Sequence, residues 1–381
     1  MQKDFHYFAT YCAAYLAGYT HEESCGIACS AQLVDECSPA FINMLEAPAA
    51  AVTTQMQAEL MDANTDVTGL QSITRIWASF HFLPQDLYAK RKKCSKKYLD
   101  KYRLLCGPNG TLVKDTVETA KGRGLQAAGL AMHVLADTWA HRYFAGTPSL
   151  VINNTDHYFY EIFPDGTEKQ IKFRHSPMQP DDVENGVYSN SIFQTSEKSV
   201  MNLGHGRAGH LPDYSFCRYK YLPAWGGYNE IVKDNPSDYY NAFCQMIYAM
   251  KYLGGGTDAF ETGVYDREAV RGYEEEIREI ITTRRINAEE AWRAFGEKLS
   301  GQPVPDHNTE GFQREYRGAA KEKKPDTFLG KFFTAATAQK SMVTNRIYKS
   351  GNMLAGYSVS PESSVWRRVM DKLAKAGEGH E

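Results

Sequence analysis

Three residues within one apolar stretch of the chain have side chains that can bind metal ions. His133, Asp137 and His141 are spaced by four residues. A step of four nearly completes a turn of an α-helix, so all three would lie along one stripe of its surface. The other residues from Leu125 to Ala140 are almost all apolar. Because imidazole nitrogen and carboxylate oxygen are ligands that zinc and other divalent ions favour, we predict a buried helix that binds metal, with zinc as the expected ion.

The same pattern has a second interpretation. Two histidines and an acid in an apolar helix can be ordinary buried polar groups that hydrogen-bond to each other or to the backbone. Three such groups in phase favour a metal, because an unpaired charge is costly to bury. Further candidate ligands lie elsewhere, mostly in apolar or glycine-rich surroundings: Asp4, His6, Asp35, His81, His205 and His210. Together these residues predict a site for two or three ions.

The elements that position these residues are predicted from hydrophobic periodicity and from Pro and Gly breaks. Helices are expected over residues 4–18, 21–36, 66–80, 85–105, 113–144, 237–254, 266–283, 287–299, 326–350 and 361–376. β-branched and aromatic runs at 150–153, 158–163 and 170–173 flank Asp165-Gly166, which is a hairpin signal. The pattern predicts a mainly α protein in three parts: a helical metal-binding core (1–146), a loop-rich insertion with short strands and further ligands (147–235), and C-terminal helices packed on the core (236–381).

Composition limits the broad class of the protein. The 381 residues are 43% hydrophobic, which is enough for a sizeable core, and the net charge of −3 gives no general attraction to polyanions. No apolar run is long enough to span a membrane, and the first residues lack the features of a signal peptide. The eight cysteines include no CxxC pair and are too few for a disulfide scaffold. We expect a cytoplasmic protein with mostly reduced cysteines.

The order of the candidate ligands resembles that in zinc-dependent phospholipase C and in the related fungal single-strand-specific zinc nucleases. The shared features are an early Asp, a His near the end of a following helix, and an HxxxD helix followed by another His. Those enzymes hold three zinc ions in a cleft between helices and hydrolyse phosphodiesters. The resemblance covers about residues 1–215 and implies a helical domain of that type, in a bacterial family that shares the fold.

Carried over residue by residue, the resemblance assigns one metal to four residues: Asp35, His81, His133 and Asp137. Asp137 would bridge this metal and a second one. His6 would take the place of the histidine on the first helix, and His141 would bind a further ion.

The chain departs from the family pattern in three places. The later His comes ten residues after the first in those enzymes and eight residues after it here. A processed N-terminal Trp supplies its free amino group there, whereas this chain begins Met-Gln-Lys, and Asp4 is the expected substitute if that position is kept. The closing HxxxE motif is missing, and its expected replacement is His205 with His210, or Asp213 just beyond.

Such a site implies hydrolysis of a phosphoester, because clustered divalent ions activate water and stabilise the leaving oxygen. Asp35 and Asp137 are the candidate general bases, and Arg142 and Arg207 are candidates for contacting the phosphate or are solvated surface charges. The sequence leaves open whether the substrate is a lipid or a nucleotide. The alternative is a non-enzymatic interaction or effector protein with a structural metal on a degenerate hydrolase fold.

A membrane surface is a candidate partner beyond the substrate. The basic stretch 90–103 can attract an anionic membrane surface, although such a run is more often a solvated helix face. No stable nucleic-acid partner is expected from the overall charge.

Overall fold

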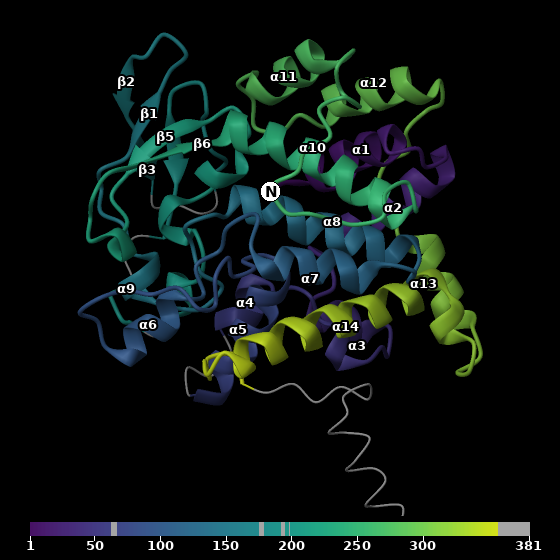
Figure 1. The fold of residues 1–381 in the computed structure, drawn as a ribbon, viewed down its shortest axis with the longest axis horizontal. Coiled ribbons are helices and arrows are strands. Elements are labelled where there is room, and N and C mark those ends of the chain that lie inside the picture. The colour runs from purple at the N-terminus through teal and green to yellow at the C-terminus, as the bar shows by residue number, and fades with distance from the viewer. Residues whose placement is uncertain (62–66, 175–178, 192–194, 198, 357–381) are drawn as a thin grey trace, which may run out of the picture.

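The computed structural model of the chain describes residues 1–61, 67–174, 179–191, 195–197 and 199–356 (Figure 1). Helices dominate, and the strands form two small sheets, so the prediction of a mainly α protein is confirmed. No described helix is both long enough and apolar enough to cross a membrane.

The bounds of the elements are as follows. The helices are η1 (Asp4–Ala9), α1 (Thr10–Leu16), α2 (His21–Leu33), α3 (Pro39–Met44), η2 (Ala49–Ala51), α4 (Gln57–Met61), α5 (Val67–Phe80), α6 (Lys96–Tyr102), α7 (Thr111–Ala120), α8 (Leu125–Ala140), α9 (Leu150–Asn153), η3 (Val200–Asn202), η4 (Gly206–Ala208), η5 (Leu211–Asp213), η6 (Ala224–Gly226), α10 (Asn235–Leu253), α11 (Glu274–Thr282), α12 (Glu289–Ser300), α13 (Glu310–Gly318), η7 (Lys324–Asp326) and α14 (Phe328–Lys349). The strands are β1 (Tyr160–Ile162), β2 (Glu168–Gln170), β3 (Lys172–Arg174), β4 (Val187–Ser189), β5 (Arg218–Tyr221) and β6 (Ile231–Asp234).

Helix α8 lies at the centre of the helical core. Every residue from Gln126 to Ala140 is buried, as its apolar sequence predicts. Helices α2, α7, α10 and α14 pack around it, so α8 is covered by elements from both ends of the chain (Figure 1). The metal-ligand candidates on α8 are therefore held in the most enclosed part of the molecule.

The approach of α2 to α8 depends on Gly129. A Cβ atom at this position would lie 2.2 Å from the carbonyl oxygen of Ile27 and 2.7 Å from the Cβ atom of Ser30. Because Gly129 has no side chain, the backbones of α2 and α8 can approach this closely. The end of α2 therefore lies beside the later part of α8.

Two of the helices predicted in the first half of the chain are shorter than expected. The pattern at 113–144 forms α7 and α8 and not one helix, because Gly122 (φ +72°) and Gly124 (φ +85°) take backbone conformations that no helix contains. Of the expected basic helix at 85–105, only α6 forms. Ser95 caps its start by accepting a hydrogen bond from the amide of Tyr98, and the residues before it are turns.

The insertion contains the predicted hairpin. Strands β1 and β2 pair antiparallel around Asp165 and Gly166 (φ +81°), in a sheet of order β2-β1-β5-β6, and β3 pairs in parallel with β4. The run at 150–153 was expected to be extended. This prediction is wrong, because the run forms the short helix α9.

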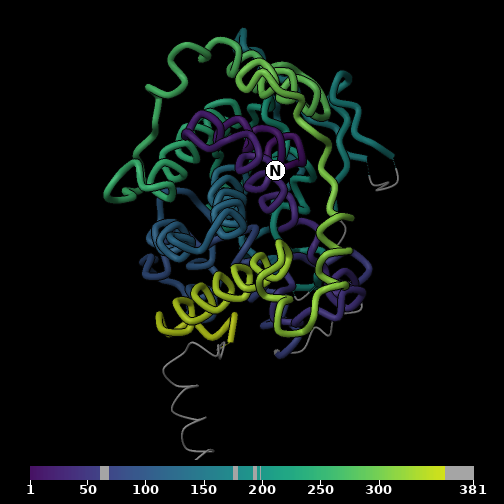
Figure 2. The backbone as a smooth tube through the Cα atoms, turned by 90° about the vertical axis from the view of Figure 1, so that its right-hand side faces the viewer, coloured from purple at the N-terminus to yellow at the C-terminus, as the bar shows by residue number. Residues whose placement is uncertain are grey.

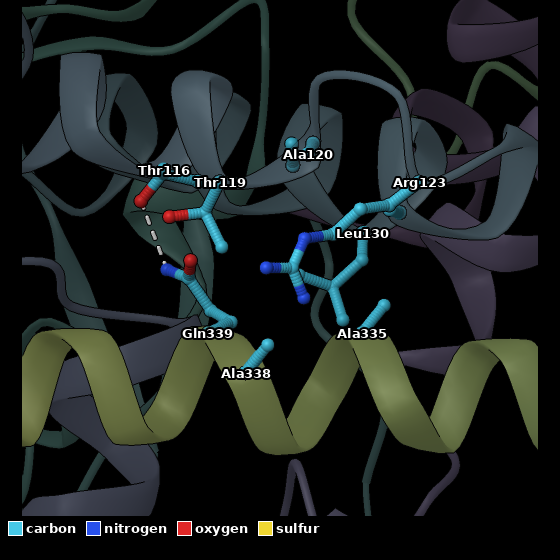
Figure 3. Close-up of a pocket in the computed structure, with 10 residues that line it drawn as sticks. Thr116, Thr119, Ala120, Arg123, Leu130, Ala335, Ala338 and Gln339 are labelled. Atoms are coloured by element: carbon cyan, nitrogen blue, oxygen red, sulfur yellow. Dashed lines mark hydrogen bonds between the residues drawn. The ribbon is translucent and has the colours of Figure 1, made fainter. Parts of the chain in front are cut away.

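The C-terminal helices enclose the core from two sides. Helices α10, α12 and α14 lie at the predicted positions. Helix α11 begins eight residues later than predicted, because residues 266–273 form loop and turns. Helix α13 was not predicted, and the expected helix at 361–376 falls outside the described residues. The chain runs down the outside of the molecule from α12 to α13 (Figure 2). Figure 3 shows how α14 is joined to α7: Gln339 donates a hydrogen bond to the hydroxyl of Thr116, 2.9 Å away.

Candidate metal centre

The candidate ligands converge where several helices end. The later part of α8 carries His133 and Asp137, and His141 directly follows this helix. Helix η1 carries His6, and the turn after α2 carries Asp35. His81 follows the last residue of α5. Three sets of side chains each place their ligand atoms within 4.8 Å of one another: His6, His133 and Asp137; Asp35, His81 and His133; and His141, His205 and Asp213.

The inner group consists of Asp35, His81, His133 and Asp137. One oxygen of Asp137 lies 3.2 Å from Nε2 of His133 and 3.3 Å from Nδ1 of His81, and those two nitrogens are 3.3 Å apart. An oxygen of Asp35 lies 3.8 Å and 3.9 Å from the same two nitrogens. Asp35 and Asp137 thus both approach the same pair of imidazole nitrogens, and Asp35, His81 and His133 form one of the three ligand sets.

The second oxygen of Asp137 faces the start of the chain. It lies 2.9 Å from the α-amino nitrogen of Met1 and 3.2 Å from Nε2 of His6, whose ring stacks on that of His133. The two oxygens of Asp137 are thus divided between two sets of nitrogen atoms. This arrangement suits a carboxylate that bridges two ions.

The outer group consists of His141, His205 and Asp213. Asp213 has one oxygen 3.2 Å from Nε2 of His141 and the other 3.8 Å from Nε2 of His205. The amino nitrogen of Met1 lies 3.1 Å from Nε2 of His141 and 3.3 Å from Asp213, so it stands between the outer group and Asp137. Gly204 (φ +56°) precedes His205, and a Cβ there would lie 2.2 Å from the ring of Phe82.

Four of the imidazoles are oriented by backbone carbonyl groups. The ring nitrogen that faces away from the ligand cluster lies within hydrogen-bonding distance of a carbonyl oxygen in each case: His133 of Ala31 (2.9 Å), His141 of His81 (2.7 Å), His205 of Gly209 (2.7 Å) and His81 of Thr53 (3.1 Å). A carbonyl can only accept, so each of these nitrogens carries the proton, and the opposite nitrogen presents its lone pair to the cluster. Metal-binding histidines are usually fixed in this way.

The ionisation states also suit metal binding. Burial lowers the pKa of His6 and of His205 to about 4. Burial alone would raise the pKa values of Asp137 and Asp213, but neighbouring imidazoles and the Met1 ammonium group hold both well below their usual range. Neutral imidazoles and ionised carboxylates are the forms that bind metal.

The spacing of the donor atoms fits a small divalent ion. Ligands that lie 2.0–2.1 Å from a tetrahedral zinc ion are about 3.4 Å from one another. The closest donor pairs of the inner group are 3.2–3.9 Å apart. His6 is fully buried, with Nε2 facing Asp137 at 3.2 Å and Nδ1 without a hydrogen-bond partner, so this imidazole is available to an ion. The residues therefore fit a site for a small divalent metal ion.

Four of the residues predicted from the sequence are not cluster ligands. Asp4 does not replace the terminal amino group, because its two oxygens accept hydrogen bonds from the amides of Phe5 and Ala288. His210 reaches the outer group only through Asp213, and its side chain is 62% exposed. Arg142 donates to Asp238, and the buried Arg207 donates to Asn202, so both guanidinium groups are engaged away from the cluster.

Two ligand candidates were underestimated from the sequence. The amino group of Met1 is fully buried, and although burial alone would lower its pKa, Asp137 and Asp213 raise it to about 11. Asp213 was named only as an alternative to His210, because nothing in the spacing of this glycine-rich loop distinguishes the two. The sequence offers no periodic signal for either residue.

Comparison with known proteins places the chain in a family. Residues 1–347 match the model of a family of unknown function, DUF6765. The chain belongs to the DUF6765 family. The match includes every residue of the inner and outer groups, so the candidate metal centre lies within the DUF6765 region. No curated protein and no solved structure matches this DUF6765 chain.

Proposed function

We propose that the protein is a zinc-dependent phosphoester hydrolase, similar in its chemistry to phospholipase C and the single-strand-specific nucleases. The observation that carries the proposal is the set of four imidazoles, each held by a backbone carbonyl so that its other nitrogen faces a shared cluster of carboxylates. Ordinary buried histidines have no need for a common orientation. A preorganised set of neutral nitrogens and ionised oxygens is what a multinuclear metal site requires.

The two groups suit different roles. The inner group offers four side chains, with Asp35 and Asp137 each close to the nitrogens of His81 and His133, and binding by all four would leave an ion no open position. The outer group offers three side chains, and His205 is 18% exposed, so a substrate or water can reach a fourth position. Zinc ions held there would lower the pKa of a coordinated water and offset the charge of a phosphoryl group.

Asp35 is the candidate general base. Both oxygens of Asp137 are committed to buried nitrogens, so this residue acts as a ligand only. Asp35 is 33% exposed and directs only Oδ1 at the inner group, so Oδ2 could accept a proton from a water at the edge of the cluster while Oδ1 binds the ion. Arg142 and Arg207 near the centre are engaged elsewhere, so charge on the substrate would be met by the ions.

The second candidate function is a structural zinc centre in a non-enzymatic protein. The four-ligand inner group favours it, because closed sites are typical of structural zinc. The partly exposed three-ligand outer group favours the enzyme.

A group of exposed lysines extends from the turns before α6 into its first turn: Lys90, Lys92, Lys93 and Lys97. These charges would favour substrates at an anionic surface.

Elemental analysis of protein purified without chelator tests the metal, and a panel of phosphodiesters, phospholipids and single-stranded nucleic acids tests the activity. We expect at least two zinc ions per chain and hydrolysis of one substrate class. His133→Ala should lose both metal and activity, whereas His157→Ala, which changes an exposed histidine of the insertion, should keep both. Less than one metal per chain sinks the proposal. Full metal content without hydrolysis of any substrate supports the structural role.

A further inference from the structure

A short buried segment before α4 links two of the inner-group ligands. Thr53 is fully buried and lies between the turn that carries Asp35 and the residue that follows α5, His81. All three of its polar groups are used. Its hydroxyl donates to the carbonyl of Val34 (2.6 Å), its amide donates to the carbonyl of Cys37 (3.0 Å), and its carbonyl is 3.1 Å from Nε2 of His81.

These contacts bracket Asp35. Val34 directly precedes it and Cys37 follows two residues later, so Thr53 holds both sides of the turn. Backbone hydrogen bonds to the end of α2 continue through this turn, since the amide of Asp35 donates to Gln32 (3.0 Å) and the amide of Cys37 donates to Leu33 (3.1 Å). The position of the Asp35 carboxylate relative to α8 is therefore set by α2 and by the bonds to Thr53 together.

The same residue also fixes His81. Its carbonyl accepts the proton of Nε2 and so leaves Nδ1 as the nitrogen that faces Asp35 and Asp137. The other histidines of the centre present Nε2, and His81 alone among the anchored four presents Nδ1. Thr53 thus determines both the tautomer of one ligand and the placement of another.

Helix α14 supports the segment from outside. The buried Lys340 donates from Nζ to the carbonyl of Val52, 2.8 Å away. The neighbouring Gln339 donates to the carbonyl of Ser79, two residues before His81, over 3.1 Å. The C-terminal helix therefore braces the backbone on both sides of the contact between Thr53 and His81.

We propose that Thr53 is a positioning residue of the metal centre, which sets the geometry of the Asp35–His81 pair through its hydroxyl and backbone. The inference rests on the proposed metal site. Hydrogen-bonding partners of metal ligands typically contribute 10–100-fold to affinity. Thr53→Val keeps the shape and the backbone but removes the hydroxyl, and Thr53→Ser restores it.

The test measures zinc affinity by competition with a chelator. We expect Thr53→Val to bind the inner-group ion about 10–100-fold more weakly and Thr53→Ser to stay within about 3-fold of the wild type. Thr334→Val is the matched control, because it also removes a hydroxyl that donates to a backbone carbonyl but lies on α14 away from the centre. The absorption spectrum of the cobalt-substituted protein provides a second readout, and only Thr53→Val should change it.

Three results would overturn the inference. If Thr53→Val leaves the zinc affinity and the cobalt spectrum unchanged, the hydroxyl has no positioning role. If Thr53→Ser binds zinc as weakly as Thr53→Val, packing of the methyl group matters instead. If Thr53→Val does not fold, Lys340→Met tests the same segment, and unchanged zinc affinity in that variant counts against the positioning role. Absence of metal from the wild type is a different failure, because it removes the metal site itself.

Discussion

The inner and outer groups are built from different kinds of structure. The inner group takes its ligands from the ends of packed helices, and the imidazoles and Asp137 in it are almost completely buried. The outer group takes His205 and Asp213 from a loop with short 3-10 turns, where Gly204 and the carbonyl of Gly209 fix the geometry. Ligands on helices are held more rigidly than ligands on loops. We infer that the inner group contributes to folding and that the outer group is the part that can exchange ligands.

Asp137 connects the two regions, and its replacement should have the largest effect. Asp137→Asn keeps the shape but removes the charge that faces Met1 and His6 on one side and the inner-group histidines on the other. We expect metal binding to weaken by more than about 100-fold, beyond what outer hydrogen-bond partners contribute, and activity to be lost with it. Elemental analysis and assay of the purified variant measure both.

A surface acid provides the control for this change. Asp326→Asn alters an exposed residue that lies 4.0 Å from the ammonium group of Lys323, and it should leave metal content and activity unchanged. If Asp137→Asn retained the wild-type metal content, the two groups would not share this carboxylate as a ligand.

The amino group of Met1 offers the second way to break the link. Residues added before Met1 would turn the amine into an amide and would have to fit where the nitrogen is fully buried between Asp137 and Asp213. We expect such an extension to lower the metal content by about one ion and to lower the melting temperature. The same extension at the C-terminal end should do neither. Calorimetry and elemental analysis of the two proteins compare them, and equal values would contradict a role for the amino group.

The outer group can be tested separately with two histidines five residues apart. His205→Ala removes a ligand candidate and should reduce outer-group affinity by more than about 10-fold while leaving the inner group filled. His210→Ala should have a smaller effect, because this side chain is mostly exposed and reaches the outer group only through an oxygen of Asp213. The outer-group affinity of each variant is measured by titration with zinc after the more weakly held ion has been removed. Equal losses would mean that His210 moves into the group when metal binds.

The difference between the regions also explains what the sequence could predict. His133 and Asp137 were predicted from a four-residue spacing in an apolar helix, and α8 places them on one face. The long helix expected around them is wrong, because periodicity alone does not show that Gly122 and Gly124 adopt positive φ. Helical ligands were thus recognisable even where the helix boundaries were not.

Loop ligands were harder to assign, for a physical reason. Between Gly204 and Asp213 no repeating contact pattern fixes which side chain turns inward, so His205, His210 and Asp213 were equivalent from the sequence. Their roles depend on tertiary contacts such as the approach of Gly204 to Phe82. The burial of the Met1 amino group likewise results from packing between η1 and distant parts of the chain.

The smallest expected effect comes from the packing beneath the inner group. In Gly129→Ala, the new methyl group would meet the carbonyl of Ile27, so α2 must shift away from α8 and lengthen the bond from His133 to the carbonyl of Ala31. We expect a loss of about 1–3 kcal/mol in the free energy of unfolding. Gly311→Ala in α13 is the matched control, because its Cβ meets nothing within 4 Å and should stabilise the helix by about 0.5–1 kcal/mol. If the inner group depends on the contact between α2 and α8, zinc protects the Gly129→Ala variant against denaturant less than it protects the wild type. Equal protection would show that the loop side of the centre, and not the helix packing, determines how tightly metal is held.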